Sequence, residues 1–102
     1  MPEKPPAPPQ ALQVQIEIDP ATAVGSFVNL AMVNHTDSEF TLDLMYLQPQ
    51  APRATVRARA IMTPKHMKRL LLALQDNIGR YETQFGAIDL GNVPHFPGTS
   101  VN

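Results

Sequence analysis

The hydrophobic pattern of this chain changes its period once, at Thr63-Pro64, and this change decides which folds the chain can adopt. Before it, apolar and polar residues alternate in short runs, as in strands with one buried face. Threonine as N-cap, proline as the first helical residue and Gly86 as the stop predict a helix over residues 64–85. Its apolar residues follow one helical stripe: Met67, Leu70, Leu71, Leu74, Ile78, Tyr81 and Phe85.

Four strands are expected before this helix. Residues 12–18, 40–46 and 55–62 alternate, whereas residues 27–33 form the apolar run of a strand that is buried on both faces or nearly so. The turn-forming residues 34–38 connect the second and third strands as a hairpin. We therefore predict the α+β class, with a four-stranded antiparallel meander followed by one long C-terminal helix.

The chain length of 102 residues suits a single domain, which we place at residues 12–90. Residues 1–11 form a proline-rich tail, typical of a disordered or polyproline II segment. We expect this tail to be a solubilising leader, and the alternative, which ranks second, is a docking motif for an aromatic groove. The spacing of Ile88 and Leu90 is typical of a short strand, and we expect residues 91–102 to form a flexible tail.

Several classes of function lack a basis in the sequence. No apolar run is long enough to span a membrane, and residues 1–10 lack the hydrophobic centre of a signal peptide, so we expect the cytoplasm. The chain has no cysteine, phosphate-binding glycine loop or nucleophile elbow, and we expect neither an enzyme nor a cofactor. His35, His66 and His95 share no ligand spacing, so no metal site is expected.

One helix covers only one face of such a sheet, so the other face predicts a partner, most simply a second copy. We expect Arg57 and Arg59, on one face of the fourth strand, to lie at the rim of this interface. The apolar residues expected at its centre are Met32, Met45, Leu47 and Ile61.

Two polar residues stand among apolar neighbours. Asp43 is expected either in solvent or in a cross-strand pair with Arg57 or Arg59. Asn29 is a candidate buried polar residue, for which a bond to neighbouring backbone is favoured over a ligand contact.

Charge is segregated along the chain. Residues 53–80 hold seven basic residues against one acidic, a net charge of +6, whereas residues 1–52 hold one basic against six acidic, a net charge of −5. Lys65, Lys68 and Arg69 lie in the first turns of the helix, where the helix dipole disfavours cations. This placement favours an anionic partner, either nucleic acid or the acidic half of another copy.

Six segments of the chain carry a family resemblance: residues 27–36, 39–44, 60–66, 70–74, 77–82 and 85–86. Together they resemble a small prokaryotic family of uncharacterised single-domain proteins of about this length. The resemblance implies a stand-alone protein and no activity. The element order is also similar, more weakly, to that of the bacterial export chaperone SecB, which assembles through its sheets and helices.

Three functions follow from these patterns. The first is a non-enzymatic protein-interaction module, a homodimer or higher homo-oligomer, that self-associates through its sheet. The second, which ranks below self-association, is a small nucleic-acid binder that uses Arg57, Arg59, Lys65, Lys68 and Arg69. The third is a chaperone-like binder of unfolded segments that uses Met32 and Met45.

Overall fold

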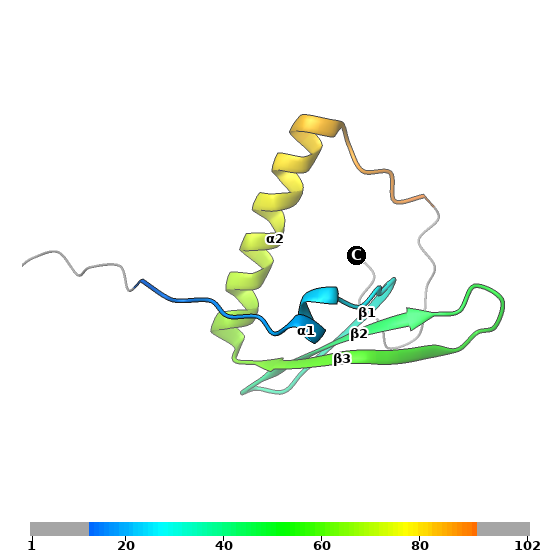
Figure 1. The fold of residues 1–102 in the computed structure, drawn as a ribbon, viewed down its shortest axis with the longest axis horizontal. Coiled ribbons are helices and arrows are strands. Elements are labelled where there is room, and N and C mark those ends of the chain that lie inside the picture. The colour runs from blue at the N-terminus through cyan, green and yellow to red at the C-terminus, as the bar shows by residue number, and fades with distance from the viewer. Residues whose placement is uncertain (1–12, 92–102) are drawn as a thin grey trace, which may run out of the picture.

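The structure, a computed structural model, describes residues 13–91. The α+β class and the C-terminal helix are as predicted, but the antiparallel sheet has three strands in the order β1-β2-β3 and not four (Figure 1). Along the chain the elements are α1 (Pro20–Val24), β1 (Leu30–His35), β2 (Phe40–Leu47), β3 (Ala54–Met62) and α2 (Pro64–Phe85).

The strand predicted at residues 12–18 is wrong for the residues that the structure describes, since residues 13–19 belong to no strand. The physical reason is the position of α1, which lies over the sheet where Ala21 and Thr22 form a hollow with Leu44 and Ala58, so that the preceding residues start above the plane of the strands. The Asp19 carboxylate accepts a hydrogen bond from the Thr22 amide at 3.2 Å, and Pro20 is the first residue of α1, so the chain turns into a helix at Asp19-Pro20. Leu12 and the two predicted tails, apart from Gly91, lie outside the described residues.

The predicted hairpin is formed by β1 and β2. The side-chain hydroxyl of Thr36 accepts hydrogen bonds from the amides of Ser38 and Glu39, both at 3.3 Å, and these bonds close the turn. β1 lies further along the chain than the predicted strand 27–33, because Asn34 and His35 still pair with β2 before the turn begins.

The register of the sheet separates its two faces. Val33, Leu42 and Ala60 lie opposite one another across the three strands, so their side chains share one face. The neighbouring row, Met32, Asp43 and Arg59, lies on the other face. We call the first the helix face, because the first turns of α2 lie against it, and the second the open face.

The helix α2 has the predicted boundaries. The Thr63 hydroxyl accepts a hydrogen bond from the His66 amide at 3.4 Å, and Gly86, with φ of 98°, ends the helix and donates its amide to the Glu82 carbonyl at 2.9 Å. Thr63 is the only residue between β3 and α2, and the helix rises steeply from that end of the sheet (Figure 1). Only its first half lies near the strands, and residues 86–91 form no further strand.

The described part of the chain has almost no core. Met45 and Asp43 are its only buried residues. Large apolar side chains stay exposed on α2 and on residues 13–18, although burial of such side chains is the main favourable contribution to folding. The part of the chain that the structure describes therefore leaves many large apolar side chains exposed.

We expect Thr63→Ala to destabilise the protein by about 1 kcal/mol, because the change removes the hydroxyl that accepts the His66 amide at the start of α2. Urea unfolding at one fixed protein concentration measures this loss. Thr63→Ser retains the hydroxyl and should restore most of the stability; equal losses in both variants would contradict a capping role.

Candidate functional site

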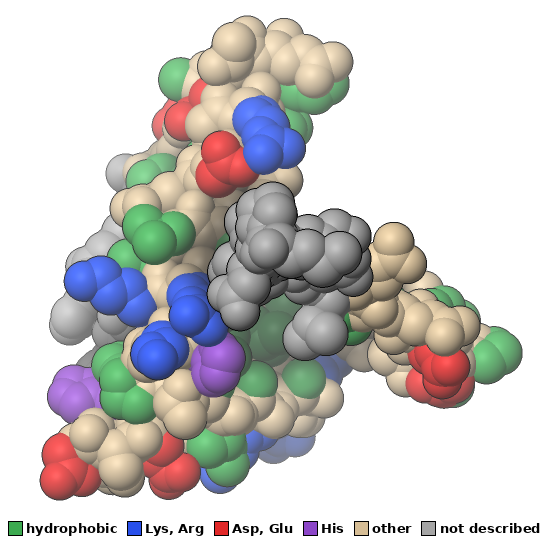
Figure 2. Space-filling model, turned by 90° about the vertical axis from the view of Figure 1, so that its left-hand side faces the viewer, with side chains coloured by type: hydrophobic (Ala, Val, Ile, Leu, Met, Phe, Trp, Pro, Cys, Tyr) green, Lys and Arg blue, Asp and Glu red, His purple; other side chains and the backbone are tan. Residues whose placement is uncertain are grey.

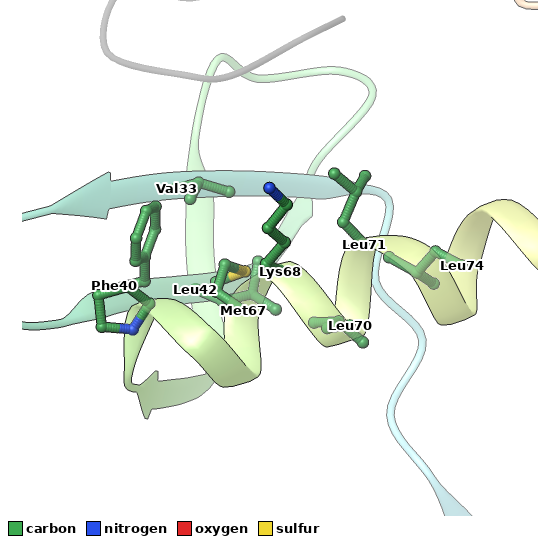
Figure 3. Close-up of a pocket in the computed structure, with 9 residues that line it drawn as sticks. Val33, Phe40, Leu42, Met67, Lys68, Leu70, Leu71 and Leu74 are labelled. Atoms are coloured by element: carbon green, nitrogen blue, oxygen red, sulfur yellow. The ribbon is translucent and has the colours of Figure 1, made fainter.

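An apolar groove of about 620 Å³ lies between α2 and the helix face of the sheet. Three elements contribute to it, β1, β2 and α2, and Figure 3 shows how their side chains converge. Lys68 is the single charged residue in its lining. We define the groove by its lining residues: Val33, Phe40, Leu42, Pro64, Met67, Lys68, Leu70, Leu71 and Leu74.

The groove continues as the apolar stripe of α2 beyond the sheet. Leu74, Ile78 and Tyr81 are each about half exposed, and Phe85 is 65% exposed. The rings of Tyr81 and Phe85 contact each other with their centroids 5.0 Å apart, which extends the apolar surface toward the end of the helix. The stripe predicted from the sequence is therefore present, but only its start is covered by the chain itself.

The open face of the sheet is centred on an ion pair. The Asp43 carboxylate accepts two hydrogen bonds from Arg59, from Nε at 2.7 Å and from Nη2 at 3.0 Å. The Asp43 side chain is 1% exposed, whereas that of Arg59 is 60% exposed, so the guanidinium covers the carboxylate. The cross-strand pair predicted with Arg59 is confirmed, and the alternatives of exposure and of Arg57 as partner are wrong.

The electrostatic effect of this pair follows from its geometry. The hydrogen bonds from Arg59 hold the pKa of Asp43 below its ordinary value, and they outweigh the desolvation that raises it. The same bonds raise the pKa of Arg59. Both groups are therefore charged at neutral pH, and their mutual attraction ties β2 to β3.

The expectation that Arg57 and Arg59 share one face is wrong. The register shifts between Leu44 and Met45, and the extra residue on β3 is Arg57. Its Nη1 donates to the Phe27 carbonyl at 2.7 Å, and its guanidinium carbon lies 4.5 Å from the centroid of the Tyr46 ring. Tyr46 alternates with Leu44 onto the helix face, so Arg57 contacts the face opposite to Arg59.

Asn29 is exposed, so its predicted burial is wrong. Its predicted bond to backbone is confirmed, because the side-chain Nδ2 donates to the Leu47 carbonyl at 3.0 Å and Oδ1 accepts from the Leu47 amide at 2.7 Å. Asn29 directly precedes β1, and its carboxamide takes the place of a backbone amide and carbonyl in pairing with Leu47. It thus has a structural role at the edge of the β1–β2 ladder.

The four predicted interface residues share one face of the sheet but differ in how far they are exposed. The register and the strand alternation put all of them on the open face. Met45 is only 6% exposed and is already buried within the chain, which corrects its assignment as a contact residue. Met32 and Leu47 are half-buried, and only Ile61, at 62%, is well exposed.

The basic residues at the start of α2 form one exposed cluster, Lys65, Lys68 and Arg69, which we call the basic turn. Figure 2 shows Lys and Arg side chains gathered over this end of the helix. Further along α2, Arg80 forms an ion pair with Asp76 one turn before it. Positive charge is therefore concentrated where the groove lies.

The three histidines are not brought together by the structure. His35 stacks against Phe40, with ring centroids 5.3 Å apart, at the end of the hairpin. His66 is in the first turn of α2, and His95 is outside the described residues. Among residues 13–91, no three side chains of the metal-binding types form a group that could hold an ion. Nor does any helix in this part of the chain have the length and hydropathy needed to cross a membrane.

These observations define a small α+β domain whose prominent surface is an apolar groove continued by a bare helix. The chain belongs to the DUF3467 family of proteins of unknown function, whose family profile matches residues 1–90. This match confirms the resemblance to a family of small uncharacterised proteins. Neither a curated protein nor a solved structure matches the chain.

The sequence did not reveal the groove as the main surface. Its helical half could be recognised from the three-four spacing of α2, and Val33, Phe40 and Leu42 from their strand patterns. What joins them is the direction in which α2 leaves β3. The one-residue connection at Thr63 was predictable, but the local pattern does not show toward which face of the sheet the helix turns.

We expect Asp43→Asn to destabilise the protein more than Asp76→Asn does, because Asp43 is enclosed by its partner whereas the Asp76 side chain is 59% exposed. The pKa of Asp43 is lower in the folded than in the unfolded chain, so its stabilising contribution is complete above the unfolded value of 3.8 and disappears as the pH falls through the folded value. The stability difference between the wild type and Asp43→Asn, measured by urea unfolding from neutral pH downward, should therefore shrink below about pH 4. A difference that does not change with pH would contradict the ion-pair assignment.

Proposed function

We propose that this protein is a non-enzymatic interaction module that self-associates, and that the contact surface is the groove together with the stripe of α2. The observation that carries the proposal is the stripe itself. Leu74, Ile78, Tyr81 and Phe85 stay half exposed or more along a helix that the sheet covers only at its start. An apolar surface of this kind on a small domain is typical of a protein interface.

A second copy fits this surface because each chain presents two complementary parts. One is the groove beside the first half of α2, and the other is the projecting second half of α2. When two α2 helices lie side by side in opposite directions, the second half of each covers the groove of the other. One two-fold contact then buries both apolar parts of both chains.

Charge favours the same antiparallel arrangement. The first half of α2 carries the basic turn and no acid, whereas the second half carries Asp76 and Glu82 with Arg80. Because Asp76 is paired with Arg80, Glu82 is the carboxylate of this half that has no basic partner among the described residues, although it accepts a hydrogen bond from the Ile88 amide at 2.8 Å. The antiparallel arrangement brings Glu82 toward the basic turn of the partner. Parallel helices would instead bring the two basic turns together, which is unfavourable.

This interface differs from the one expected on the open face, where Met45 is buried and Met32 and Leu47 are half-buried. The same burial reduces support for a chaperone-like role of Met32 and Met45. Nucleic-acid binding is supported less than self-association, because Arg57 and Arg59 contact opposite faces and each has a partner within the chain. Only the basic turn then remains as a shared cationic surface.

We expect the protein to have twice the chain mass of 11.2 kDa by sedimentation equilibrium and native mass spectrometry, and Ile78→Glu to weaken this dimer by about 100-fold or more. The substitution places a carboxylate in the centre of the stripe, where the dimer would bury it. Size measurement across a dilution series gives the change in dissociation constant.

Leu72→Glu is the matched control, because Leu72 is 56% exposed and lies on the same helix but away from the stripe. It should leave the dimer mass and the dissociation constant close to those of the wild type. A monomeric wild type, or one that carries nucleic acid removable by salt, would overturn the proposal.

A further inference from the structure

Residues 13–19, which we call the arm, have the pattern of a strand without a strand partner. Val14, Ile16 and Ile18 alternate with polar residues and are 74%, 88% and 64% exposed. Within the part of the chain that the structure describes, the arm pairs with no strand. Such a segment has unpaired backbone donors and acceptors and one apolar face, both of which a sheet edge satisfies.

The arm is led away from its own sheet. Asp19 caps α1, and α1 lies on the helix face, where Ala21 and Thr22 form a hollow with Leu44 and Ala58. The arm therefore begins above the sheet and not in its plane. Figure 1 shows it running from α1 past α2 and away from the strands.

The sheet has two edges, β1 and β3, and charge distinguishes them. The arm carries Glu17 and Asp19 and no basic residue, whereas β1 has no charged residue. β3 carries Arg59, whose side chain is 60% exposed beside Asp43, whereas Arg57 is held by Phe27 and Tyr46 on the other face. An acidic strand is therefore matched by the edge of β3.

We propose that the arm of one copy adds to the edge of β3 of a second copy as an antiparallel fourth strand. This inference rests on the self-association proposed above and names a second contact within it. In this pairing Glu17 lies opposite Arg59 on the open face. The Arg59 side chain is 60% exposed there, so its guanidinium can donate to a second carboxylate beside Asp43.

This register also matches the apolar residues. With Glu17 opposite Arg59, Ile16 falls opposite Ala60 and Ile18 opposite Ala58, both on the helix face. The small alanines leave space for the isoleucine side chains, which extend the apolar floor beneath α2. The bulge at Arg57 lies beyond Ala58, so the ladder from Ala58 to Met62 is regular where the arm pairs.

Amide hydrogen exchange tests the pairing through Gln15→Pro, which removes a backbone donor of the arm, with Gln15→Ala as the matched control that retains it. In the wild type and in Gln15→Ala, exchange in the arm and at β3 should be slower by about tenfold or more than in Gln15→Pro. Equal exchange in all three proteins would overturn the inference. If the wild type is a dimer in that case, the proposed function stands and only the arm assignment fails.

Disulfide cross-linking shows whether the arm pairs with the edge at β3 or with the edge at β1. Only introduced cysteines can react, because the chain has no cysteine of its own. Register places Gln15 opposite Ile61, so mixing Gln15→Cys chains with Ile61→Cys chains should give a disulfide-linked heterodimer under mild oxidation. Asn34→Cys is the control, because Asn34 lies in the same row of the sheet as Ile61 but on β1. Preferential linkage to Asn34→Cys, or linkage within a single chain that carries both Gln15→Cys and Ile61→Cys, would overturn the inference.

Discussion

The connection between β3 and α2 is the constraint on which the rest of the structure depends. Thr63 is the only residue between the two elements, and it is also the N-cap of the helix. A connection this short does not let the helix turn back across the sheet. It therefore leaves from the end of β3, covers the helix face only with its first half and projects beyond it (Figure 1). The groove and the bare stripe both result from this geometry.

Local signals in the sequence predicted the elements well where one residue decides the conformation. Thr63, Pro64 and Gly86 bound α2 because a capping oxygen, a missing amide and a left-handed φ act within one turn. Asp19-Pro20 is the same kind of start signal for α1, but the alternating residues before it favoured a strand ending there. Alternation shows which residues of a segment share a face. It does not show whether the edge of a sheet lies close enough to pair with that segment.

The candidate site was predictable only in part, for the same reason. Alternation and opposite charge predicted a cross-strand pair of Asp43 with Arg57 or Arg59 as one alternative to exposure in solvent, because both act between adjacent strands. The structure shows that Arg59 is the partner. The separation of Arg57 from Arg59 was not predictable, since the bulge at Arg57 has no glycine or proline to mark it. The burial of Met45 and the exposure of Ile61 depend on neighbours that are distant in the sequence, and alternation alone treats the two residues alike.

The basic turn has a consequence during synthesis of the chain. Lys68 and Arg69 directly precede the run of five apolar residues at 70–74, which leaves the ribosome after the whole sheet. Charges beside such a run hinder its association with other unfinished chains. The cations that oppose the dipole of α2 therefore stand where gatekeeper residues are expected, directly before an uninterrupted apolar run.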